Sequence, residues 1–282
     1  MCSSDLIAFA GGEFVWQRAG ELLPRAARLF LEPGAPLQAR AGASGAFAYL
    51  AVEGGVDTPV IMGSRATHTR SGLGGIGGRS LRDGDVLPVG LSRPERGQYF
   101  EASIGAPWLA RGTMPVRVIL GPQDDYFDPD ACNIFFSSEF TLTAMADRMA
   151  YRFEGPEVES ASGYDIISDG AVMGAIQITG SKKPFVLMAD RQPTGGYPKL
   201  GAVARADIGR IAQMRPGETC RFKMVSPREA QQSLLQLEDR IAGAISHLGP
   251  LPQKLTAKSL FEANLIGGVF DASPGDRNDR TS

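Results

Sequence analysis

Residues 184–205 read Pro-Phe-Val-Leu-Met-Ala-Asp-Arg-Gln-Pro-Thr-Gly-Gly-Tyr-Pro-Lys-Leu-Gly-Ala-Val-Ala-Arg. An apolar run at residues 185–189 leads into a polar turn, and a second apolar run follows at residues 200–204. Short apolar runs separated by Gly and Pro are typical of β-strands. Glycines let the backbone approach a ligand closely, and functional groups often lie on loops that rigid strands hold. The stretch therefore predicts two strands joined either by a plain hairpin turn, with Asp190 and Arg191 paired, or by a loop that carries a site.

The same alternation of apolar runs and turn residues continues along the whole chain, which contains 35 Gly and 19 Pro. It predicts a mainly β protein. The expected strands are residues 6–10, 27–31, 47–52, 86–89, 116–120, 172–178, 185–189, 200–204 and 221–225.

Two short helices are expected among these strands. One begins at Asp128, because Pro129 then occupies the first helical position, where a missing N–H has no cost. The other runs from a cap at Asp207 to about Met214 and ends before Pro216.

The longest helix is expected to begin at Ser226. Residues 226–229 (Ser-Pro-Arg-Glu) form a capping box, in which the Ser and Glu side chains satisfy each other's backbone N–H groups. Residues 249–250 (Gly-Pro) are expected to end this helix. One apolar face, which we expect to dock against the sheets, recurs at helical spacing: Ala230, Leu234, Leu237, Ile241 and Ile245.

At 282 residues the chain is long enough for two domains. We expect an N-terminal β unit over residues 1–112 and a C-terminal β unit over residues 113–225. A helical extension over residues 226–270 follows, and a polar tail over residues 271–282 is expected to be disordered.

The bulk composition argues against several classes of function. The 29 basic and 31 acidic residues nearly cancel, which is unlike proteins that bind nucleic acid or anionic membranes. No apolar run is long enough to cross a membrane and no signal peptide is recognisable, so a cytoplasmic protein is expected. Three scattered Cys and two His predict neither a disulfide framework nor a metal site.

Several other motifs are weak signals. Residues 72–77 (Gly-Leu-Gly-Gly-Ile-Gly) match a dinucleotide-binding fingerprint, but turn residues follow them where that fingerprint requires a helix. A Ser-His-Asp triad would need His68 or His247. We interpret His247 as a residue at the C-terminal end of a helix, where its side chain faces the helix dipole. We interpret His68 as a surface residue that could reach a site. Lys223-Met224 lacks the second Met of a biotin-carrying hairpin, so any biotin would be supplied by another protein.

Polar clusters that follow or interrupt the apolar runs provide the candidate site. Their amides, carboxylates and cations suit a small substrate with amide or carboxylate groups. We expect Gln123, Arg148, Gln177, Asp190 and Lys199 to converge on one concave surface. The candidate catalytic residues are Asp190, Lys199 and Arg148. The candidate substrate-binding residues are Gln123, Gln177, Arg191, Thr194, Gly195, Gly196 and Tyr197.

Six motifs resemble, in order, those of the allophanate hydrolase subunit 2 family of biotin-dependent carboxyltransferase-like proteins. This family includes one of the subunits of bacterial 5-oxoprolinase and half of the carboxyltransferase region of urea carboxylase. The motifs lie at residues 49–57 (Tyr-Leu-Ala-Val-Glu-Gly-Gly-Val-Asp), 63–67 together with 74–79, 121–123 (Gly-Pro-Gln), 147–149 (Asp-Arg-Met), 174–177 (Gly-Ala-Ile-Gln) and 188–199.

This resemblance implies a fold of two cyclophilin-like β-barrel units and a partner from the subunit 1 family, together with a further oxoprolinase subunit. It also implies chemistry that uses ATP with Mg²⁺, at the level of the complex, on an amide such as 5-oxoproline or urea. The sequence departs from the family at Ala150, where Gly is usual, and at residues 179–183, which replace a Pro-Gly turn. The family's opening segment has no counterpart before Leu6, so we expect an incomplete first unit with an open edge at residues 6–10 or a neighbouring strand.

Three functions remain open on the sequence. The first is a subunit of an ATP-dependent 5-oxoprolinase that hydrolyses a cyclic amide. The second is a carboxyltransferase that moves a carboxyl group from biotin to urea or a similar amide. The third is a non-catalytic binding or regulatory module.

Overall fold

The computed structural model describes residues 5–91, 100–105 and 115–251. The described residues up to Pro250 belong to one compact unit. The described chain is mainly β with few helices, which confirms the predicted fold class. The domain boundary expected at residue 112, most of the extension beyond Leu251 and the polar tail lie outside the described residues. That division into domains therefore stays a prediction.

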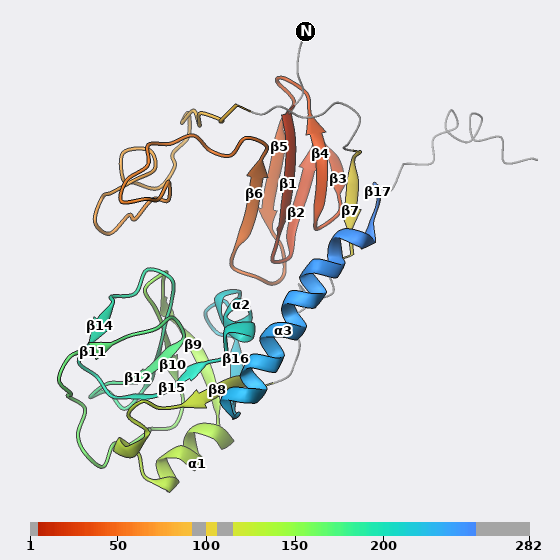
Figure 1. Cartoon of the computed structure of the whole chain (residues 1–282). Coiled ribbons are helices and arrows are strands. Elements are labelled where there is room, and N and C mark those ends of the chain that lie inside the picture. Colours follow the sequence, from red (N-terminus) through yellow and green to blue (C-terminus); the bar gives the residue numbers. More distant parts are fainter. Residues whose placement is uncertain (1–4, 92–99, 106–114, 252–282) are drawn as a thin grey trace, which may run out of the picture. The chain divides into compact units, whose positions relative to one another are not determined.

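The N-terminal strands form two antiparallel sheets (Figure 1). Stacking of the Phe9 and Trp16 rings, with centroids 4.2 Å apart, connects the two sheets. The first sheet has the order β17-β7-β4-β1-β6 and consists of β1 (Asp5–Gly11), β4 (Ala27–Leu31), β6 (Ala48–Val52), β7 (Ala102–Ile104) and β17 (Leu248–Pro250). The second has the order β3-β2-β5 and consists of β2 (Phe14–Arg18), β3 (Glu21–Leu23) and β5 (Leu37–Ala41).

The first sheet ends at β6 on one side and at β17 on the other, and β1 lies inside it. Within the described residues, β1 pairs with β4 on one side and with β6 on the other, and β6 ends the sheet. None of the five residues of β6 is buried. Residues 6–10 in β1 are therefore paired on both sides, and an incomplete first unit stays a prediction.

Seven strands in the second half of the chain close into a barrel, with the order β10-β13-β12-β15-β8-β16-β9. All pairings in it are antiparallel except that of β8 with β16. Closure removes the unpaired strand edges that an open sheet exposes. The strands are β8 (Val116–Leu120), β9 (Glu139–Ala146), β10 (Ala150–Glu154), β12 (Ala175–Ile178), β13 (Pro184–Leu187), β15 (Lys199–Val203) and β16 (Thr219–Met224).

Aromatic rings dominate the barrel core. Helix α1 (Pro129–Ser137) packs against β16, where the rings of Phe135 and Phe222 stack with centroids 4.8 Å apart. The predicted start of α1 is confirmed, because the Asp128 carboxylate accepts a hydrogen bond of 2.7 Å from the N–H of Ala131. The cap thus satisfies an N–H group at the open end of the helix.

The predicted cap at Asp207 is wrong in its role. Helix α2 (Ile208–Ala212) follows this residue, but the Asp207 side chain makes no capping hydrogen bond. Its carboxylate instead accepts three hydrogen bonds of 2.7–2.9 Å from Arg117 on β8. The Asp207 carboxylate therefore forms a long-range ion pair and does not cap the helix, although the local pattern predicted a cap.

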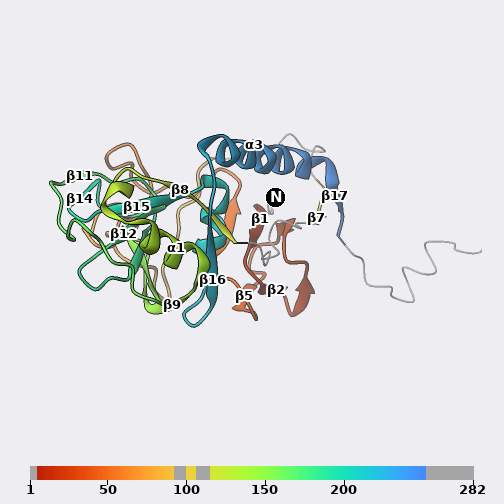
Figure 2. The same ribbon diagram turned by 90° about the horizontal axis from the view of Figure 1, so that it is seen from below.

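Helix α3 (Pro227–Ala244) is continuous (Figure 2). Its capping box is confirmed, because the Glu229 carboxylate accepts hydrogen bonds from the Ser226 N–H at 2.7 Å and hydroxyl at 2.8 Å. The predicted end and face are partly wrong. The helix ends at Ala244, while the Gly-Pro pair lies in β17, and Ile241 is 52% exposed although it belongs to the predicted apolar face.

Two further differences concern strands. Residues 86–89 form no strand, and Val89 makes only an isolated bridge with Val56. Pro88 lacks an N–H and cannot donate to a strand ladder. Conversely, the sequence does not predict the β9–β10 hairpin, the sheet of β2, β3 and β5, or strands β7 and β17. None of the helices in the described ranges is long and apolar enough to cross a membrane.

Candidate functional site

Gln177 on β12 and Lys199 on β15 lie opposite each other in neighbouring strands of the barrel. They are 3% and 1% exposed, although amide and ammonium groups are seldom buried. Ile176 and Ile178 on either side of Gln177 belong to the barrel core. Because side chains alternate along a strand, Gln177 points to the opposite face of the sheet.

A short two-stranded ribbon covers the Gln177 side chain. It consists of β11 (Asp169–Gly170) and β14 (Thr194–Gly195), which pair in antiparallel fashion. A Cβ atom at Gly195 would lie 2.4 Å from the Gln177 Nε2. Glycine therefore allows the backbone of the paired-glycine loop to pass directly over the amide.

Two residues, Asp169 and Gln123, contact the Lys199 side chain and backbone. The Asp169 Oδ2 lies 3.1 Å from the Lys199 Nζ, and it accepts a hydrogen bond of 3.1 Å from the Gln123 Nε2. Gln123 also binds Lys199 through the backbone, because its Oε1 accepts from the Lys199 N–H at 3.2 Å. The hydrogen bond from Gln123, followed by the nearby Lys199 ammonium, holds the pKa of Asp169 below its usual value. Asp169 is thus a carboxylate at neutral pH.

The nitrogen donors of Gln177 and Lys199 are not fully used by the described residues. The Gln177 Nε2 has no hydrogen-bond partner among them. The contact of the Lys199 Nζ with Asp169 is within ion-pair distance but does not satisfy hydrogen-bond geometry. An ammonium has three N–H donors, and Asp169 can take at most one of them well. A buried donor without a partner costs about 1–3 kcal/mol.

Arg148 and Asp190 form a second group. The Arg148 Nη2 donates to the Asp190 Oδ1 at 2.9 Å, and the Asp190 N–H donates to the Arg148 carbonyl at 2.7 Å. These two residues line a groove of about 330 Å³. The rest of its lining comes from a glycine-rich segment, residues 61–74, which includes His68.

The other predicted residues lie in the loop between the two groups. The Arg191 Nε donates to the Ala171 carbonyl at 3.0 Å, and the Gly196 carbonyl accepts from the Ile166 N–H at 2.9 Å. Thr194 is exposed on β14, and Tyr197 is 40% exposed.

The structure thus brings Gln123, Gln177 and Lys199 together, and it pairs Arg148 with Asp190. That all five converge on one concave surface stays a prediction. Asp169 was missed, because Asp-Gly in a polar segment is an ordinary turn signal. The groove wall at residues 61–74 was also missed, apart from the suggestion that His68 could reach a site.

Neither described free thiol offers an obvious nucleophile. Burial raises the pKa of Cys220 to about 12 and also raises the pKa of Cys132. A thiol becomes a good nucleophile when it ionises, so both are inert at neutral pH. In the described ranges, no group of three or more His, Cys, Asp or Glu side chains could hold a metal ion.

Residues 2–224 match the family model of the carboxyltransferase domain, subdomains A and B. The chain belongs to the carboxyltransferase domain family. It is 36% identical over 203 residues to a 5-oxoprolinase subunit of Escherichia coli, covering 72% of this chain and 64% of that protein. It is 26% identical over 253 residues to the urea amidolyase of Saccharomyces cerevisiae, covering 83% of this chain and 14% of that protein.

The fold of this carboxyltransferase domain is also found in a solved structure. The crystal structure of the urea amidolyase of Kluyveromyces lactis matches with a TM-score of 0.76 at 24% identity. The match covers 86% of this chain and 16% of that chain. The chain therefore spans less than two thirds of the length of each of these relatives.

Proposed function

We propose that this carboxyltransferase-domain chain is a subunit of an ATP-dependent complex that acts on an amide, most directly a 5-oxoprolinase that converts 5-oxoproline to glutamate. Its similarity to a protein named as a 5-oxoprolinase subunit supports the assignment. The observation that carries it is the pair of buried, incompletely satisfied donors at Gln177 and Lys199. Such donors fit a substrate that presents carboxylate oxygens, and 5-oxoproline has a carboxylate.

The proposed role of Lys199 is to bind a substrate oxygen and to stabilise negative charge there as the reaction proceeds. Donors that are fixed in place before reaction are effective because they need no reorganisation. Gln123 and Asp169 hold the lysine, and Gln177 supplies the neighbouring donor. Arg148 and Asp190 are the other proposed catalytic residues. Arg191, Thr194, Gly195, Gly196 and Tyr197 are proposed to shape the substrate loop.

The proposed complex includes a subunit 1 family protein and a further oxoprolinase subunit. ATP with Mg²⁺ would supply the driving force at the level of this complex, and we assign no ATP-binding residue to this chain. The barrel at residues 113–225 is proposed to be the domain that carries the site. The N-terminal sheets are proposed to form the other domain.

A second candidate function is transfer of a carboxyl group from biotin to urea or a similar amide. It is favoured by the match to a urea amidolyase over 83% of this chain. In this case biotin would be supplied by another protein. A biotinylated protein that co-purifies with the complex would favour this second function.

The test is ATP-dependent turnover of 5-oxoproline and of urea by the chain reconstituted with its partner subunits. Lys199→Met should lower 5-oxoproline turnover by about 100-fold or more, the usual effect of losing a transition-state donor. Lys223→Met is the matched control, because Lys223 is exposed on the same barrel, and it should keep full activity. Unchanged turnover in Lys199→Met would refute the assigned role, and turnover of urea alone would favour the second function.

A further inference from the structure

The groove at Arg148 and Asp190 presents a donor and an acceptor side by side. The two side chains meet in one hydrogen bond of 2.9 Å, between Nη2 and Oδ1. A guanidinium has five N–H donors and a carboxylate accepts about four hydrogen bonds. One bond between them therefore leaves most of this capacity for a ligand. The groove volume of about 330 Å³ suits a small molecule.

The backbone keeps this donor and acceptor together independently of their ion pair. The Asp190 N–H donates to the Arg148 carbonyl, and the Met188 N–H donates to the Met149 carbonyl, both at 2.7 Å. The opposite wall, at residues 61–74, lines the same groove. The arrangement is therefore built before any ligand arrives.

We propose that the Arg148–Asp190 pair recognises the edge of a cis-amide, whose N–H donates to Asp190 and whose C=O accepts from Arg148. A lactam or a cyclic urea is locked in this form, with N–H and C=O on the same side. An acyclic secondary amide is almost always trans, so these two groups point in opposite directions. This proposal rests on the proposed function for its reaction, and it adds the place where the amide is recognised.

The ligands that distinguish this mode are 5-oxoproline, imidazolidin-2-one and N-methylacetamide. The first two are a lactam and a cyclic urea, and the third is an acyclic trans amide. Binding to the full 282-residue chain is measured by saturation-transfer NMR titration, without ATP or partner subunits. The two cyclic compounds should bind. N-methylacetamide should bind at least about 50-fold more weakly, because it must first adopt the cis form.

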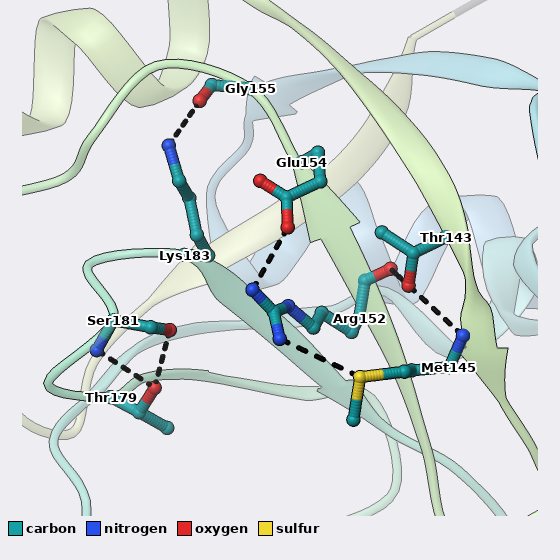
Figure 3. Close-up of polar contacts among 8 residues, drawn as sticks. All are labelled: Thr143, Met145, Arg152, Glu154, Gly155, Thr179, Ser181 and Lys183. Atoms are coloured by element: carbon teal, nitrogen blue, oxygen red, sulfur yellow. Dashed lines mark hydrogen bonds and ion pairs between the residues drawn. The ribbon is translucent and has the colours of Figure 1, made fainter.

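Arg148→Met and Asp190→Leu test the two residues. Each should weaken binding of both cyclic compounds by about tenfold or more, the effect of losing a hydrogen bond to a charged group. The matched control is Arg152→Met. Arg152 lies on β10 of the same barrel and forms an ion pair of the same length, 2.9 Å, with Glu154, while its guanidinium also contacts Met145 (Figure 3). Because Arg152 does not line the groove, this variant should bind as the wild type does.

Three results would overturn the proposal. They are equal binding of N-methylacetamide, unchanged binding in both groove variants, and failure of both cyclic compounds to bind. Failure of the proposed function would give a different result. The assembled complex would show no ATP-dependent turnover, while the isolated chain would still distinguish cyclic from acyclic amides.

Discussion

Asp207 and Lys199 are charged residues in two regions of the same barrel, and both are 1% exposed. Asp207, beside β8, accepts three hydrogen bonds from Arg117 and also lies 3.4 Å from Arg210. Lys199, on β15, has only Asp169 within ion-pair distance among the described residues, and that contact is poorly aligned. Breaking a buried ion pair whose partners are in place costs stability, whereas a buried charge that lacks partners itself costs stability and is retained for another reason.

The largest loss of stability is expected from substitution of Asp207. Asp207→Asn removes the negative charge from the bonds with Arg117 and should lower the free energy of unfolding by about 3 kcal/mol. This is the low end for a broken buried ion pair, because the Arg117 side chain is 32% exposed and can be hydrated. Urea unfolding measures it, with Glu154→Gln, an exposed ion-pair residue, as the control that should change little. A loss below about 1 kcal/mol would remove the contrast with Lys199.

The pH dependence of that loss sharpens the comparison. Burial alone would raise the pKa of Asp207, but the hydrogen bonds from Arg117 outweigh it and hold the pKa below its usual value. A lowered carboxyl pKa contributes stability that is complete above the unfolded pKa, near 4, and is lost as the pH falls through the folded pKa. The stability difference between wild type and Asp207→Asn should therefore be constant near pH 7 and shrink below about pH 4. A difference that grows on acidification would contradict the assignment.

The sequence predicted those parts of the fold that local patterns determine. Strands β4 and β8 occupy the predicted residues, and the capping box at Ser226 starts α3 as expected. It failed where distant residues decide the outcome. The Asp207 carboxylate binds Arg117, 90 residues away, instead of capping the next helix.

The candidate site shows the same limit. Lys199 and Gln177 were identified because they are polar residues in or beside apolar runs. Their juxtaposition depends on a register shift between β12 and β15, after Ile176, which no local pattern reveals. Asp169 is a turn residue by every local signal, and only the closed barrel brings it to Lys199.

The central claim is that Lys199 is buried for a ligand and not for stability, and thermal unfolding of Lys199→Met tests it most directly. Methionine fills a similar volume without an ammonium that needs partners, and Asp169, whose side chain is 50% exposed, can be hydrated. The variant is predicted to unfold at the same temperature as the wild type or a few degrees higher. This corresponds to a gain of about 0–1 kcal/mol in the free energy of unfolding. A loss as large as that of Asp207→Asn would show that Lys199 is a structural ion-pair residue and would contradict the account.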